Sequence, residues 1–105
     1  MKLTGKAKEA FEEWYFNLPN SMGTNYGAKD ITINRFYSLP QSMQWGIYQD
    51  WADSIRFELR VTVNHGSGWY EVLVNIPEYW NAYPTRQEAR KAAIEKLNEI
   101  YNNQN

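Results

Sequence analysis

Residues 55–76 read IRFELRVTVNHGSGWYEVLVNI, and this stretch decides the fold. From Ile55 to Val63, apolar side chains alternate with polar ones, which is the period of a strand with one buried face. Residues 64–68 have the composition of a hairpin turn, and a second strand is predicted from Trp69 to Ile76. A slip of one residue would expose the apolar face of the first strand, so the pairing register is strongly specified.

The second strand of the hairpin departs from strict alternation on its outer face. Val72 and Val74 belong to the inward face, but Trp69 and Leu73 fall where polar residues are expected. Large apolar side chains in such positions are either covered by another element or form a contact patch. The sequence is compatible with both interpretations.

Two helices are predicted before the hairpin, separated by a long loop. The first runs from Thr4 to Leu18, with Thr4 as its N-cap and Pro19 as its stop. Residues 19–38 are predicted as a loop because they are rich in turn formers, and residues 31–33 are a candidate short edge strand. A loop of this length is uncommon in a compact domain, so function or mobility is expected there.

The second helix is predicted from about Pro40 to Ser54, because proline suits the first turn of a helix. Gly46 weakens a helix by about 1 kcal/mol relative to alanine, and we interpret it as a site of close packing against another element. One broad face of this helix is expected to be buried, formed by Met43, Ile47, Trp51 and Ile55 with Tyr48 and Ala52 beside them.

A third helix is predicted to close the chain. Thr85 and Glu88 have the spacing of a capping box, so the helix is expected from Arg86 to about Tyr101. Residues 78–83 are a candidate third strand, and residues 102–105 are expected to be a frayed polar tail.

Together these elements predict a single α+β domain over residues 1–105. Its helices would pack on one face of a small antiparallel sheet, in the order α-α-β-β-(β)-α. Hydrophobic residues make up 43% of the chain and charged residues 22%, a balance typical of globular domains.

The composition also excludes several classes of protein. The chain has no cysteine, which excludes disulfides, thiolate catalysis and cysteine-based zinc sites. Its net charge of −1 provides no global attraction for nucleic acid or an anionic membrane. No stretch approaches the roughly 20 apolar residues of a membrane span, and no signal sequence follows the first methionine. We therefore expect a protein of the bacterial cytoplasm that does not bind membranes.

Candidate catalytic and metal-binding residues are few. His65, the only histidine, lies in the hairpin turn without a partner that would orient it as a general base. Asp50 and Asp53 share a helix face and resemble half of a cation site or an acid/base pair, but no further ligand accompanies them. We expect ordinary surface residues here, and accordingly no enzyme, no cofactor and no metal.

Basic residues cluster at the start of the last helix. Arg86, Arg90 and Lys91 could clamp phosphates, aided by the free N–H groups of a helix N-terminus. Alternatively, ion pairs of Lys91 with Glu88 and Glu95 would make this a solvated face. These three basic residues are the candidate nucleic-acid-binding residues.

Aromatic residues are unusually frequent, at 16% of the chain with five tryptophans and eight tyrosines. They exceed what an obvious core stripe needs, so they indicate a partner surface, a stacking platform for bases, or an aromatic-rich core. The candidate partner-binding residues are Trp69, Leu73, Tyr79, Trp80 and Tyr83.

Two resemblances to known families accompany these patterns. Residues 36–54 contain Leu39-Pro40-x-Ser42-Met43-x-Trp45-Gly46 and Asp50-Trp51-x-Asp53-Ser54. With these elements, most of the chain resembles small phage- or prophage-encoded proteins of uncharacterised function. This resemblance implies a phage origin and brings no catalytic residues.

The C-terminal half is similar to the double-stranded RNA-binding domain. A hairpin leads into Thr85-Arg86-Gln87-Glu88-Ala89-Arg90-Lys91-Ala92-Ala93, as that family's sheet leads into its Lys/Ala-rich last helix. The chain departs from the family in three ways. Arg86 and Gln87 stand where a lysine pair grips phosphates, the family's Gly-Pro-x-His loop is absent, and an extra helix separates the first helix from the hairpin. The resemblance implies a fold, and topology alone does not assign a function.

The leading hypothesis is a non-enzymatic protein-interaction module, encoded by a phage or prophage, that binds a host or phage protein through its aromatic surface. The alternative is a nucleic-acid-binding domain that uses the basic start of the last helix. The sequence leaves the partner and the oligomeric state open.

Overall fold

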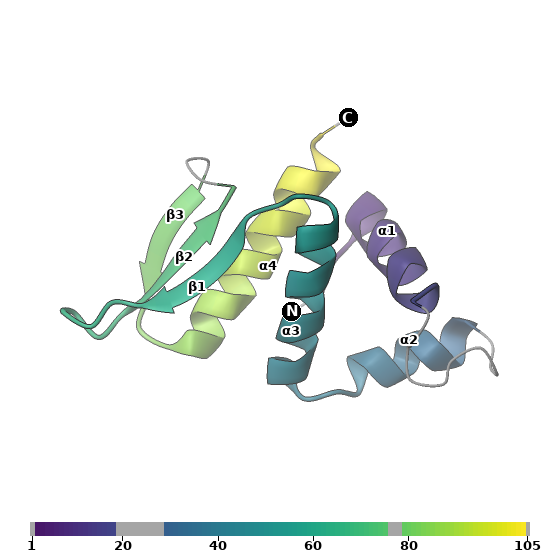
Figure 1. Cartoon of the computed structure of the whole chain (residues 1–105), viewed down its shortest axis with the longest axis horizontal. Coiled ribbons are helices and arrows are strands. Elements are labelled where there is room, and N and C mark those ends of the chain that lie inside the picture. Colours follow the sequence, from purple (N-terminus) through teal and green to yellow (C-terminus); the bar gives the residue numbers. More distant parts are fainter. Residues whose placement is uncertain (1, 19–28, 76–78, 105) are drawn as a thin grey trace.

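The structure, a computed structural model, describes residues 2–18, 29–75 and 79–104. In chain order, its elements are α1 (Gly5–Phe16), α2 (Lys29–Tyr37), α3 (Gln41–Ser54), β1 (Leu59–Val63), β2 (Tyr70–Val74), β3 (Tyr79–Tyr83) and α4 (Arg86–Asn102) (Figure 1). The α+β class is confirmed, with one more helix than the sequence predicted.

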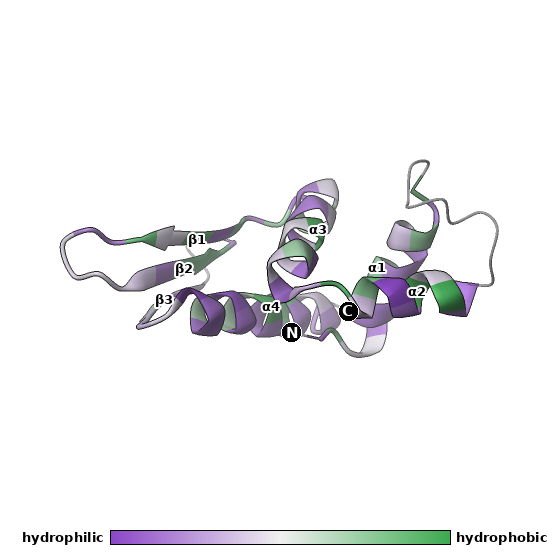
Figure 2. Ribbon diagram, turned by 90° about the horizontal axis from the view of Figure 1, so that it is seen from below, coloured by the Kyte–Doolittle hydropathy of each residue, from purple (hydrophilic) through white to green (hydrophobic). Residues whose placement is uncertain are grey.

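The sheet is an antiparallel meander in the order β1-β2-β3. Val61 pairs with Val72 in the hairpin, and Val72 pairs with Asn81 of β3, so the candidate third strand is confirmed. Val72 and Val74 are fully buried on the face that α4 covers. Seen along its edge, the sheet has α4 beneath it and no described helix above it (Figure 2). Ile76 and Glu78, included in the predicted strands, lie outside the described residues.

The last helix begins as its capping pattern predicts. The Thr85 hydroxyl oxygen accepts a hydrogen bond of 3.1 Å from the backbone N–H of Glu88, which satisfies one of the free donors of the first turn. Ala89 and Ala93 are completely buried, and their small side chains allow α4 to approach the sheet. The prediction of a frayed tail from residue 102 is wrong at Asn102, because this residue belongs to α4 and is half-buried.

The first strand begins at Leu59 and not at Ile55, because the chain first forms a C-cap on α3. The Arg56 N–H donates to Asp53 O at 3.1 Å, and the Phe57 N–H donates to Ala52 O at 2.8 Å. These two bonds form a Schellman motif, which requires a left-handed residue, and Arg56 supplies it with a φ of 63°. The alternation of apolar residues continues through this turn, so the pattern alone could not separate it from the strand.

The predicted buried face of α3 is confirmed in part. Tyr48, Trp51 and Ala52 are buried as predicted, but Trp45 joins them and Met43 is 53% exposed. The interpretation of Gly46 was also wrong, because a Cβ placed there would meet no atom within 4 Å. Apolar residues lie on most of the circumference of α3, so packing against neighbouring elements determines which face is buried.

Residues 29–37 form α2, where the sequence predicted the end of a loop and a short strand. Thr32, Ile33 and Phe36 are buried at helical spacing, while Ile31 is 52% exposed. β-branched residues favour strands, but the Phe36 ring packs 4.9 Å from the Phe11 ring, and this tertiary contact decides the local structure. Residues 19–28 of the predicted loop lie outside the described residues.

The two ends of the described chain are joined by asparagine side chains from α4. Thr4 precedes α1 as predicted, but its side chain does not cap the helix. Instead the Ala7 N–H donates to Asn102 Oδ1 at 2.8 Å, and the Thr4 N–H donates to Asn98 Oδ1 at 2.7 Å. Two of the free N–H groups at the start of α1, those of Thr4 and Ala7, are thus satisfied from the other end of the sequence.

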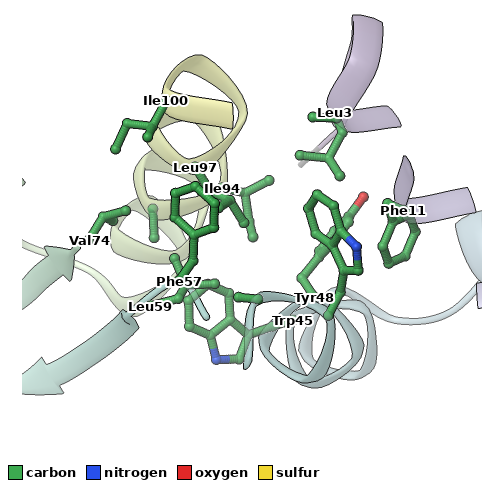
Figure 3. Packing of buried hydrophobic residues seen from close by; sticks show 14 of the residues in the cluster. Leu3, Phe11, Trp45, Tyr48, Phe57, Leu59, Val74, Ile94, Leu97 and Ile100 are labelled. Carbon is green, nitrogen blue, oxygen red and sulfur yellow. The ribbon is translucent and has the colours of Figure 1, made fainter. Parts of the chain in front are cut away.

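One continuous core connects the sheet to the N-terminal helices, from Val74 through Leu97 to Phe11 (Figure 3). Its N-terminal part is aromatic, since the Phe11 ring lies 4.8 Å from the Tyr48 ring and 5.6 Å from the Trp51 ring. Many of the aromatic residues are therefore part of the core, and fewer of them remain as candidates for a partner-binding surface.

Candidate interaction surface

The outer face of the sheet carries a row of three large side chains. The register places Leu73 opposite Arg60 on one side and opposite Trp80 on the other. Side chains alternate along a strand, so these residues point away from α4, which covers Val72 and Val74 on the inner face. Trp80 is 58% exposed, Leu73 is half-buried, and Arg60 is exposed.

Trp80 and Leu73 are direct cross-strand neighbours, with Cβ atoms about 5 Å apart in such pairs, and Arg60 lies one strand further. We call Arg60, Leu73 and Trp80 the outer row. Arg60 forms a solvent-exposed ion pair with Glu58 at 3.4 Å, which leaves its guanidinium accessible. Arg60 was not among the predicted site residues, although counting residues across the hairpin turn places it opposite Leu73.

Tyr79 and Tyr83 do not join the outer row, because they lie on the inner face of β3. They are half-buried beside α4, and their hydroxyl oxygens are 2.8 Å apart. This hydrogen bond and partial burial raise the pKa of Tyr83 to about 12. Together with Lys96 and other residues of α4, the two rings line a hollow of about 210 Å³. The five predicted partner-binding residues are thus divided between two faces.

Trp69 is 47% exposed at the start of β2, next to the hairpin turn. It lies four residues from Leu73, which corresponds to about 13 Å along a strand. Trp69 is therefore too far along the strand to form a compact cluster with Trp80.

The three basic residues of α4 lie in different environments. The Arg86 guanidinium is 5.0 Å from the centre of the Tyr70 ring, and that of Arg90 is 5.7 Å from the centre of the Trp45 ring. The Arg90 Nε atom is buried without a hydrogen-bond partner in the described part of the chain. Arg90 therefore serves the contact between α3 and α4, whereas Lys91 is exposed.

The other polar candidates remain separate. His65, Asp50 and Asp53 are all exposed, the first in the hairpin turn and the others on α3. Among residues 2–18, 29–75 and 79–104, no group of three or more acidic or histidine side chains is arranged to hold a metal ion.

A second hollow, of about 400 Å³, lies between α1 and α2 and was not foreseen from the sequence. Its Glu12 carboxylate accepts a hydrogen bond of 2.9 Å from the Tyr37 hydroxyl and contacts Lys8 Nζ at 3.1 Å. Burial, reinforced by Glu12, raises the pKa of Tyr37 far above its usual range. Lys29, which also lines the hollow, contacts Glu13 at 2.6 Å, so both lysines are already neutralised and we assign no ligand here.

Comparisons with protein families, with curated proteins and with solved structures found no match for this chain. None of the described helices is long and apolar enough to span a lipid bilayer.

Proposed function

We propose that this protein is a non-enzymatic interaction module that binds a protein partner through the outer row. The observation that carries the proposal is Trp80, a large aromatic side chain left 58% exposed on a sheet face that no described helix covers. Tryptophan and arginine, with tyrosine, are the residue types enriched among those that dominate binding energy at protein interfaces. Leu73 adds apolar area between them.

The proposal retains the sequence hypothesis but changes its residues. Trp80 and Leu73 remain and Arg60 is added. Tyr79 and Tyr83 are removed because they line the inner face, and Trp69 is removed because it lies too far along β2. The phage origin of the protein remains a prediction that suggests bacterial and phage proteins as the first partners to examine.

A second function, duplex RNA binding, is favoured by one observation. From residue 41 onward the order is helix, three antiparallel strands and helix, which is the order of the double-stranded RNA-binding domain. The charges argue against RNA binding, because the Arg90 guanidinium packs on the Trp45 ring and the net charge of the chain is −1. Affinity for phosphates grows with each cation that contacts them. We therefore expect that duplex RNA is not retarded by the protein in a low-salt gel shift. Retardation that is lost in Lys91→Ala would favour this second function.

The protein-binding proposal is tested by comparing Trp80→Ala with Met43→Ala. Both side chains are about equally exposed, at 58% and 53%, but Met43 lies on α3 away from the outer row. Affinity capture from bacterial extract is expected to lose its partner with Trp80→Ala and to retain it with Met43→Ala. Equal retention by both variants would contradict the proposal, as would unfolding of Trp80→Ala, which would make its ring structural.

A photo-reactive amino acid at Thr62 provides an independent test. Thr62 is exposed and lies two residues along β1 from Arg60, on the same outer face of the sheet. Cross-links to the captured partner are expected from position 62 and not from position 91 at the start of α4. Cross-links from position 91 alone would move the binding surface to the helix.

A further inference from the structure

The hydrogen bonds of the hairpin determine which backbone groups of β3 are free. The Asn64 N–H donates to Trp69 O at 2.7 Å, and the Asn75 N–H donates to Glu58 O at 2.9 Å. In an antiparallel pair, every second residue exchanges hydrogen bonds with its partner. Because residues 69 and 75 bond toward β1, Tyr70 and its alternate neighbours in β2 must bond toward β3.

The same alternation continues into β3. Tyr79, Asn81 and Tyr83 are the partners of Val74, Val72 and Tyr70, so their backbone groups point to β2. The N–H and C=O groups of Trp80 and Ala82 therefore point to the outer edge of the sheet. In agreement, the Ala82 N–H donates to the side chain of its own neighbour, Asn81 Oδ1, at 2.8 Å.

The edge of β3 lacks the features that usually prevent strand addition. Its five residues include no charged side chain and no proline, whereas exposed edges are typically protected by lysine, proline or a bulge. Tyrosine and tryptophan, three of the five, favour extended pairing. The opposite edge is partly occupied, because α3 lies against β1 and Gln49 Nε2 donates to Leu59 O at 3.4 Å.

We propose that the edge of β3 binds β3 of a second copy of this chain, in antiparallel pairing about a twofold axis at Asn81, to form a six-stranded sheet. This register is the one that pairs all five residues of both strands. The Ala82 N–H then gives up its bond to Asn81 Oδ1 and donates to Trp80 of the second copy, which in return donates to the Ala82 C=O. The symmetry repeats this exchange. The inference uses the strand edge and does not depend on the proposed binding by the outer row.

The side chains of β3 are self-complementary in this register. On the outer face, the large Trp80 lies beside the small Ala82 of the second copy. On the inner face, Tyr79 lies opposite Tyr83 of the second copy, and the two β2 strands are three strand spacings, or about 14 Å, apart. Since α4 packs mainly on β2, the two α4 helices are separated by more than the 8–10 Å of direct helix packing. The tyrosines of both copies occupy this gap.

The tyrosine pair thereby acquires a role that the single chain does not explain. The hollow beside Tyr79 and Tyr83 is lined by one lysine, Lys96, and two carboxylates, Glu95 and Glu99, and Lys96 pairs with Glu99 at 3.1 Å. Lys96 Nζ lies 5.1 Å from the centre of the Tyr79 ring and covers its inner side.

The test is a charge exchange at the twofold axis. Position 81 faces itself, so Asn81→Lys and Asn81→Asp each place like charges together and are expected to weaken dimerisation several-fold, by about fivefold per 1 kcal/mol. An equimolar mixture of the two variants is expected to restore the dimer, because lysine then faces aspartate. Sedimentation velocity over a range of concentrations measures all three samples and the unmodified protein.

Thr62→Lys and Thr62→Asp are the matched controls, since Thr62 is exposed on β1 away from the axis, and both are expected to leave the dimer unchanged. A circular dichroism spectrum checks that every variant is folded. A second variant, Ala82→Pro, removes two of the four intermolecular hydrogen bonds without touching the β2–β3 ladder and is expected to be monomeric. A monomeric unmodified protein at all concentrations, or a mixture that fails to restore the dimer, overturns the proposal.

Discussion

Arg56 is a position where a single substitution should make this protein more stable. It has a φ of 63° at the end of α3, in the left-handed region that glycine adopts without strain. Its backbone is held there by the two Schellman hydrogen bonds, from Arg56 to Asp53 and from Phe57 to Ala52. The substitution Arg56→Gly keeps these bonds and removes the Cβ that opposes them.

The expected gain follows from two opposing contributions. The left-handed conformation costs a residue with a Cβ about 1–2 kcal/mol, whereas glycine adds about 0.5–1 kcal/mol of backbone entropy to the unfolded chain. The net gain in the free energy of unfolding is about 1 kcal/mol. For a domain of this length, the entropy of unfolding is about 0.2 kcal/mol/K at the midpoint, so the melting temperature should rise by about 4 °C.

Thermal unfolding followed by circular dichroism measures this gain, with two controls. Arg56→Ala keeps the Cβ and removes the guanidinium, so it is expected to leave the melting temperature nearly unchanged. Asn75→Gly changes the other left-handed non-glycine position among the described residues, with a φ of 48°, but removes the side-chain oxygen that accepts the Glu58 N–H at 3.0 Å, so it should destabilise. If Arg56→Gly and Arg56→Ala both lower the melting temperature by the same amount, the reasoning is refuted. That result would show that the Arg56 guanidinium stabilises the folded state.

Three further predictions concern the helices and the tyrosine pair. Gly46→Ala should raise the free energy of unfolding, measured by urea titration, by about 1 kcal/mol, because the added Cβ meets no atom within 4 Å. A lower free energy of unfolding would show that another element packs closely on Gly46. Thr85→Ala should lower it by about 1 kcal/mol while Thr85→Ser does not, and equal losses would rule out the cap. The pKa of Tyr83, about 12, exceeds the usual value near 10, so the folded state favours its neutral form. That stabilisation is complete below pH 10 and is lost as the pH rises from 10 to 12, so the melting temperature should fall over this range. Tyr79→Phe should make this fall smaller. A fall of the same size in Tyr79→Phe would contradict a role for the Tyr79–Tyr83 hydrogen bond.

The hairpin and the last helix were predictable because each depends on local rules. Period-two alternation fixes the register of residues 59–63, and the spacing of Thr85 and Glu88 fixes the start of α4. Sequence reasoning failed where tertiary contacts decide. In α2, the packing of Phe36 on Phe11 overrides the strand preference of residues 31–33.

The candidate surface was only partly predictable for a related reason. The tryptophans look alike in sequence, yet Trp51 is 1% exposed and Trp80 is 58% exposed, because one faces α1 and α4 and the other faces the open side of the sheet. Alternation does separate Trp80 from Tyr79 and Tyr83, which was available from the sequence once 79–83 was accepted as a strand. What covers each face depends on where α4 packs, and that is a property of the whole fold.

The most direct test of the outer row is a chemical-shift titration of the isotope-labelled protein with the partner identified by capture. The largest changes are expected at the backbone amides of Arg60 and Leu73 and at the indole N–H of Trp80. Changes centred on Arg86 and Lys91, with the Trp80 indole unaffected, would contradict the account and place the binding surface at the start of α4.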